Sequence, residues 1–210
     1  MSPHSRPMDE GVELKLSGRR GGRRRLVLPA VLAGLLLSAL AGVAVPSYRN
    51  TMMPAGVVIH HTAVPLPPGG RPLDVRVLDE IHRRRGYGIF YWGRFYHVGY
   101  HYLILPDGTV QSGRPERCQG AHAVGYNHYI GVCLVGDFSA PDDLHDRNGP
   151  REPTAAQMQA LVELTARLRA RYGLPLERMI QHREVNPNTQ CPGERFPFEE
   201  LMQRLRERGS

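Results

Sequence analysis

Residues 181–193 read Gln-His-Arg-Glu-Val-Asn-Pro-Asn-Thr-Gln-Cys-Pro-Gly. This stretch offers an imidazole at His182 and a sulfur at Cys191, separated by a loop that contains proline. Proline fixes φ and the closing glycine permits a turn, so the loop samples few conformations. Metal ligands must converge from a backbone of that kind. A histidine and a cysteine at this spacing are common, however, and the stretch alone does not establish a metal site.

A matching segment lies far upstream. Residues 57–62 read Val-Val-Ile-His-His-Thr, a short β-branched run that ends in two histidines. Such a run is typical of a buried strand. Two imidazoles and one thiolate are the donors that zinc prefers, and three protein ligands leave one tetrahedral position for water, as in catalytic sites. The spacing cannot decide which of His60 and His61 is the ligand.

Six blocks of the chain resemble the zinc amidases that cut peptidoglycan between N-acetylmuramic acid and L-alanine. These include phage endolysin amidases and the peptidoglycan recognition proteins that share their fold. The blocks are residues 58–63, 98–102, 106–110, 120–127, 130–136 and 181–193. Each block is common, but six in the family's order are hard to obtain by chance. The resemblance implies that the cofactor is Zn²⁺ and that its ligands are His60, His182 and Cys191. It gives His61 a packing or supporting role.

The resemblance also implies catalytic roles for Tyr100 and Thr189. The Tyr100 phenol would hydrogen-bond the attacking water or the oxyanion, whereas without the family a half-buried strand tyrosine is the simpler interpretation. Endolysin relatives carry lysine two residues before the cysteine, where this chain has Thr189, and recognition-protein relatives often carry threonine. The only lysine is Lys15, so the domain offers a hydroxyl donor, which is weaker than a cation. The loop is slightly longer than expected, which leaves Asn188 and Gln190 as alternatives.

A third set of residues, His122, Tyr126 and Asn127, matches the family's Gly-x-His-x-x-Gly-Tyr-Asn block. We expect them on the cleft wall as substrate contacts, with a structural histidine as the alternative. Other amidases of the superfamily place a glutamate base in the strand that here covers residues 131–134, which contains no carboxylate. More of the proton handling would then fall to the metal site and Tyr100, or to the substrate.

The chain has three cysteines, an odd number for an exported domain. If Cys191 binds a metal, only two cysteines remain, so the odd number is explained. Cys118 lies in a polar loop and Cys133 in an apolar strand, so we expect two free thiols, with a disulfide as the alternative.

The N-terminal part predicts a membrane segment. Residues 1–25 form a basic segment, and residues 26–45 contain no charge over a length that spans a hydrocarbon core as a helix. Basic residues ahead of the run predict a cytoplasmic N-terminus and an exported remainder. The long run favours a single-pass anchor in the cytoplasmic membrane. A signal peptide cut near Ala41 or Ala44, which would give a secreted or periplasmic protein, is the alternative.

After a linker at residues 46–54, residues 55–210 form the expected zinc amidase domain. The net charge of the chain is +7, of which residues 1–25 contribute +4, so the domain is only mildly basic. Its arginines are scattered rather than focused, which argues against nucleic-acid binding and suits approach to an anionic wall polymer.

Strands and helices alternate in this domain, which predicts an α/β fold with a central mixed β-sheet covered by helices. We expect strands at residues 55–60, 99–105, 109–112, 130–135 and 179–182, helices at 75–85, 154–172 and 198–206, and surface loops at 63–72 and 138–152. The aromatic segment 89–95 has no counterpart in compact family members. It is expected as a hairpin or a loop at the cleft rim, where its rings stack on sugars or pack on the core.

The sequence therefore predicts a membrane-anchored, zinc-dependent N-acetylmuramoyl-L-alanine amidase that acts on peptidoglycan outside the cytoplasm. The first alternative is a module of the same fold that binds wall fragments or muropeptides without cutting. A zinc amide hydrolase for another N-acyl substrate is the second.

Overall fold

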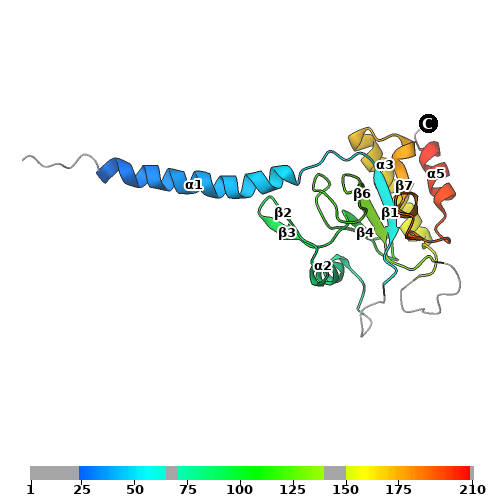
Figure 1. Ribbon diagram of the computed structural model, residues 1–210. Helices are drawn as coiled ribbons and strands as arrows, with labels where there is room; N and C mark the ends of the chain where they lie inside the picture. Colours follow the sequence, from blue (N-terminus) through cyan, green and yellow to red (C-terminus); the bar gives the residue numbers. More distant parts are fainter. Residues whose placement is uncertain (1–23, 65–70, 140–149, 209–210) are drawn as a thin grey trace, which may run out of the picture. The chain divides into compact units, whose positions relative to one another are not determined.

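The computed structural model describes residues 24–64, 71–139 and 150–208 (Figure 1). The chain divides into two compact units, residues 1–41 and 42–210. Helix α1 covers Arg24–Arg49, and its part Pro29–Arg49 is long and apolar enough to cross a membrane, with a mean hydropathy of 2.0. That test rests on length and composition only, and a signal sequence near an N-terminus passes it too.

A five-stranded sheet forms the centre of the second unit, in the order β5-β4-β6-β1-β7. Strands β4, β6, β1 and β7 run parallel, and β5 pairs antiparallel with β4. The predicted mixed sheet is therefore confirmed. The strands cover Val57–His61 (β1), Tyr102–Ile104 (β4), Val110–Ser112 (β5), Ile130–Leu134 (β6) and Met179–Gln181 (β7).

The aromatic segment forms a separate two-stranded hairpin, with β2 at Ile89–Tyr91 and β3 at Arg94–Tyr96. Of the two alternatives for this segment, a hairpin or a loop, the structure confirms the hairpin. The predicted strands are one to several residues too long, and the last one ends at Gln181 because His182 already begins a helix. Parts of the two predicted surface loops, residues 65–70 and 140–149, lie outside the described residues.

The helices of this unit lie on both faces of the sheet (Figure 1). The best-predicted helix is α3, where Thr154 Oγ1 accepts from the backbone N–H of Gln157 at 3.0 Å and Gly173 ends the helix at a φ of 63°. The residues of α3 that face the core recur at helical spacing and include Met158, Leu161, Val162, Thr165 and Leu168. The helices cover Val75–Arg84 (α2), Ala155–Tyr172 (α3), Leu176–Arg178 (η3, a 3₁₀ turn), His182–Val185 (α4) and Phe198–Glu207 (α5).

The sheet is buried on both faces. Val57 and Ile59 of β1 pack into the larger core with residues of α3 and α5, and a smaller core around Leu78 of α2 covers the other face. All five residues of β1 are buried, which explains why a near-continuous apolar run forms this strand. His60, the next-to-last residue of β1, is thereby placed where water has little access, with 1% of its surface exposed.

Candidate metal centre

The parallel pairing of β1 and β7 brings two histidines together. Ile59 of β1 lies opposite Gln181 of β7, so the next residues, His60 and His182, leave the same edge of the sheet side by side. Their ring centroids are 4.5 Å apart. Ligand sites of open α/β sheets form at this carboxyl edge of parallel strands.

The loop after α4 carries the cysteine back to the same edge. Arg183 N–H donates to the carbonyl oxygen of Cys191 at 2.8 Å, and Cys191 N–H donates to Thr189 Oγ1 at 3.1 Å. Gly193 continues the loop at a φ of +100°, where a Cβ would lie 2.1 Å from the carbonyl oxygen of Phe138. Only glycine fits this close approach, so the backbone itself fixes where Cys191 lies.

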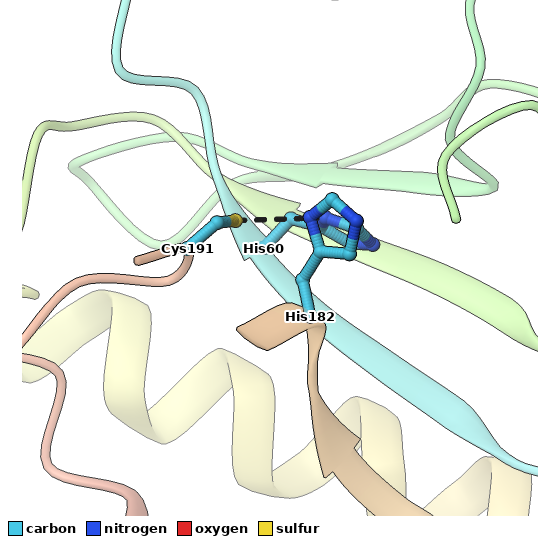
Figure 2. Close-up of side chains that lie close together, drawn as sticks. All are labelled: His60, His182 and Cys191. Carbon is cyan, nitrogen blue, oxygen red and sulfur yellow. Dashed lines mark hydrogen bonds between the residues drawn. The ribbon is translucent and has the colours of Figure 1, made fainter. Parts of the chain in front are cut away.

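The three candidate ligands converge from three different segments (Figure 2). One ligand atom each of His60, His182 and Cys191 lie within 4.8 Å of one another. Cys191 Sγ lies 3.6 Å from His60 Nδ1 and accepts from the backbone N–H of His61 at 3.4 Å. His61 itself points to the other face of the strand, where its Nδ1 accepts from Phe138 N–H at 3.0 Å.

A chain of hydrogen bonds fixes the tautomer of His60. His122 Nε2 lies 3.0 Å from the carbonyl oxygen of Tyr129, which can only accept, so this nitrogen carries the proton. Burial lowers the pKa of His122 to about 3, so the ring is neutral and its Nδ1 is an acceptor. His60 Nε2 lies 3.0 Å from that atom and must donate to it. The network therefore leaves the lone pair of His60 Nδ1 free on the side of Cys191.

The electrostatics of the cluster suit a divalent cation. Burial, followed by the neighbouring His122 and His182, lowers the pKa of His60, and burial lowers that of His182, so both imidazoles are neutral. Burial raises the pKa of the Cys191 thiol to about 12, although the His61 N–H and Arg183 lower it. A thiolate here requires a compensating positive charge, which a bound metal ion supplies. Two neutral imidazole nitrogens and one sulfur are a donor set that fits Zn²⁺.

One side of the cluster borders open space. A pocket of about 320 Å³ lies beside His182, and its wall includes Tyr87, His122, Val124, Asn127 and Asn186. His182 and His122 thus connect the candidate metal centre with a space that a substrate can enter.

Tyr100 lies against the cluster from the α2 side. Its ring centroid is 5.1 Å from that of His60 and 5.7 Å from that of His82. Burial raises the pKa of the Tyr100 phenol, as do the nearby Cys133 and Cys191, so the phenol keeps its proton at neutral pH. It can therefore act as a hydrogen-bond donor.

The other predicted site residues have structural contacts. Thr189 Oγ1 shapes the cysteine loop, as described above. Asn127 lines the pocket, and its Oδ1 accepts from the backbone N–H of His122 at 2.9 Å. Tyr126 stacks with His128, their ring centroids being 6.1 Å apart. The structure thus brings His122 and Asn127 to the pocket wall, and the role of Tyr126 as a substrate contact stays a prediction.

Two contacts could not be predicted from the sequence. They are the hydrogen bond between His122 and His60 and the one between His122 and the carbonyl oxygen of Tyr129. The block that contains His122 was a signal for a functional or structural histidine. Which residue His122 contacts depends on the orientation of its ring, which packs between Gly120 and Gly131. A Cβ on either glycine would lie 2.4 to 2.6 Å from this ring, so both positions need glycine. The expected free thiols are confirmed, because Cys118 and Cys133 are unpaired.

The sequence profile of the family Amidase_2, described as N-acetylmuramoyl-L-alanine amidase, matches residues 50–194. The chain belongs to this family. The chain is 41% identical over 121 residues to the endolysin of Escherichia phage T7, an alignment that covers 57% of this chain and 70% of the endolysin.

Two solved structures share the fold of this chain. The N-acetylmuramoyl-L-alanine amidase LysC from Clostridium intestinale superposes with a TM-score of 0.57 at 32% identity, covering 74% of this chain and 87% of LysC. The peptidoglycan recognition protein LE in complex with tracheal cytotoxin, a monomeric diaminopimelic acid-type peptidoglycan, gives 0.54 at 26% identity, with 73% and 82% covered. These likenesses support peptidoglycan amidase activity, and they show that the chain is similar both to amidases and to peptidoglycan recognition proteins.

Proposed function

We propose that this chain hydrolyses the amide between N-acetylmuramic acid and L-alanine in peptidoglycan, with Zn²⁺ held by His60, His182 and Cys191. The observation that carries the proposal is the convergence of these three donor atoms within 4.8 Å beside an open pocket. Membership of the amidase family supplies the reaction class.

Bound zinc would polarise the scissile carbonyl and lower the pKa of water. The protein's own groups prepare the site for it. His122 holds His60 in the tautomer that presents Nδ1, and the loop of Cys191 is fixed by backbone hydrogen bonds. Tyr100 keeps its proton and donates toward the carbonyl oxygen as that oxygen gains charge.

Thr189 is proposed as a second donor to the same oxygen. Its Oγ1 accepts from Cys191 N–H at 3.1 Å, which leaves the hydroxyl proton to point elsewhere. A neutral hydroxyl stabilises negative charge less than a lysine does, and Lys15 is the only lysine of the chain. His122, Tyr126 and Asn127 are proposed as substrate contacts, and two of them, His122 and Asn127, lie at the pocket.

We further propose that residues 26–45 anchor the protein in the cytoplasmic membrane, with residues 1–25 inside and the amidase domain, residues 55–210, outside after a linker at 46–54. The support is the uncharged run, its basic flank and the helix Pro29–Arg49. A secreted or periplasmic form after signal cleavage is the alternative.

Purified full-length protein with added zinc tests the activity. Mass spectrometry of digested sacculi should show released stem peptides that begin with L-alanine and glycan strands that retain N-acetylmuramic acid. A chelator should stop the release, and zinc should restore it. Release that a chelator leaves unchanged contradicts the zinc proposal, and no release by the zinc-loaded protein contradicts the amidase proposal.

A second candidate function is binding of wall fragments without cleavage. Threonine in place of lysine at position 189 favours it, as does the likeness to a recognition protein whose structure contains a peptidoglycan monomer. Isothermal titration with a soluble muropeptide, run beside the cleavage assay, separates the two: binding without product formation supports the second candidate.

A further inference from the structure

The hairpin of β2 and β3, residues 89–96, carries an unusual turn. Its two central residues, Trp92 and Gly93, both have positive φ, at 46° and 84°. Asparagine or glycine is preferred at the first of these positions, and a bulky side chain there is unfavourable because its Cβ lies close to the backbone. Packing does not offset this cost, because Trp92 is 62% exposed. The tryptophan is therefore unfavourable for the turn itself.

The turn is bound to the last turn of α1. Trp92 N–H donates to Ser47 Oγ at 2.7 Å, and Asn50 Nδ2 donates to the carbonyl oxygen of Phe90 at 2.9 Å. Ser47 is fully buried. These residues all belong to the compact unit 42–210, so the position of the hairpin relative to the end of α1 is fixed.

This attachment sets the depth of the hairpin in any bilayer that α1 crosses. The apolar span ends at Arg49, and Ser47 lies two residues before that end. A helix rises 1.5 Å per residue, so Ser47 lies about 3 Å along the axis from the end of the span. With the proposed anchor across the bilayer, the backbone of Trp92, which is hydrogen-bonded to Ser47, lies near the level where the hydrocarbon core meets the headgroups.

The side chains at this level have the chemistry of a membrane interface. Trp92, Phe95 and Tyr48 expose 62%, 63% and 80% of their surfaces, and Arg49 and Arg94 are exposed beside them in the sequence. Tryptophan and tyrosine concentrate at the boundary between hydrocarbon and water, and arginine pairs there with lipid phosphate. The exposed rings make few contacts within the domain, and contact with lipid would bury their apolar surface.

We propose that the hairpin, residues 89–96, is a second membrane contact whose tip inserts Trp92 into the headgroup region of the leaflet from which the amidase domain emerges. This inference rests on the proposed membrane anchor. The hairpin would then be an attachment of the amidase domain to the bilayer in addition to the proposed anchor. The occupant is a lipid surface rather than a glycan, because the turn is attached to the end of the apolar helix.

The chain contains one tryptophan, so its native fluorescence reports on this turn alone. The full chain is reconstituted in vesicles whose lipids carry a quencher either near the headgroup or at the end of the acyl chain. We expect strong quenching by the headgroup-proximal label, weaker quenching by the deep label, and several-fold less quenching by aqueous acrylamide than for tryptophan amide in water. Full acrylamide accessibility without quenching by either lipid overturns the proposal.

A matched control moves the fluorophore. In the double variant Trp92→Phe and Gln203→Trp, the tryptophan lies on the exposed face of α5, which is far from the hairpin within the same unit (Figure 1). We expect no lipid quenching there. Protection of Trp92 that appears only after soluble glycan fragments are added would assign the hairpin to sugar binding, against the proposal.

The same vesicles separate this inference from the proposed function. Digestion of sacculi without lipid quenching of Trp92 refutes the hairpin contact and leaves the amidase intact. Quenching without digestion refutes the amidase and leaves the contact standing. Release of the chain from the vesicles by alkaline extraction refutes the anchor and the hairpin contact together.

Discussion

His122 offers the sharpest test of how the candidate metal centre is built. We predict that His122→Ala weakens zinc binding without unfolding the domain. The substitution removes the acceptor for His60 Nε2–H and the donor to the Tyr129 carbonyl, both at 3.0 Å. His60 can then adopt the other tautomer or rotate, and its Nδ1 is no longer held toward Cys191.

The size of the effect follows from those two bonds. Leaving a buried donor or acceptor unsatisfied costs about 1–3 kcal/mol. Loss of a group that orients a metal ligand typically lowers metal affinity by about 10- to 100-fold, which corresponds to about 1.4–2.8 kcal/mol. The two estimates agree, and we expect a fall in zinc affinity within that range.

The assay is a zinc titration against a chromogenic chelator at neutral pH, with denaturant unfolding of the metal-free protein as the measure of stability. His122→Asn is the matched control, since its Oδ1 can take the place of Nδ1 as acceptor, and we expect it to restore part of the affinity. Wild-type zinc affinity in a folded His122→Ala protein would refute the tautomer reasoning. A raised KM for muropeptide with unchanged zinc affinity would show that His122 is a substrate contact only.

Three further predictions concern the cysteine loop and the half-buried carboxylate of Glu116. Cys191→Ser should abolish cleavage and zinc binding while the domain stays folded, as measured by product release, metal analysis and circular dichroism; retained cleavage would exclude Cys191 as a ligand. Gly193→Ala should destabilise the domain by about 1–3 kcal/mol from its φ of +100° alone, with more from the clash with Phe138, and denaturant unfolding measures this; an unchanged midpoint contradicts the described loop. Burial raises the pKa of Glu116, but hydrogen bonds from two tyrosine hydroxyls and Arg171 outweigh it and lower the pKa overall. Its contribution to stability is therefore present above the unfolded pKa of about 4.3 and is lost as pH falls through the folded value, so Glu116→Gln should flatten the acid limb of the stability profile.

The elements of the fold could be predicted where local chemistry decides them. Thr154 with Gln157 caps α3, Gly173 ends it in a left-handed conformation, and the apolar spacing between them marks the buried face. The buried strand β1 and the histidines at its end could also be predicted, because a short β-branched run bounded by polar residues is typical of a buried strand. Strand ends were less accurate, since pairing partners rather than the strand's own residues decide where a ladder stops.

The candidate site was predictable in its residues but less so in its connections. The resemblance to amidases named His60, His182 and Cys191, and the structure brings their ligand atoms together. The sequence could not show that Thr189 Oγ1 is engaged by Cys191 N–H or that His122 bonds to His60. Those contacts depend on ring and hydroxyl orientations set by segments far away along the chain.

The strand order has a consequence for how the protein matures. Strand β1 comes early in the domain and β7 late, yet the two are neighbours, and Cys191 follows later still. Contacts between such distant segments form slowly and only after the intervening chain is available. During export of the domain across the membrane in the proposed orientation, the segment that carries His60 would cross before the segment that carries His182 and Cys191, so the set of donors would stay incomplete until nearly the whole domain had crossed. The topology itself would therefore keep the exported domain inactive until its C-terminal third has folded onto β1.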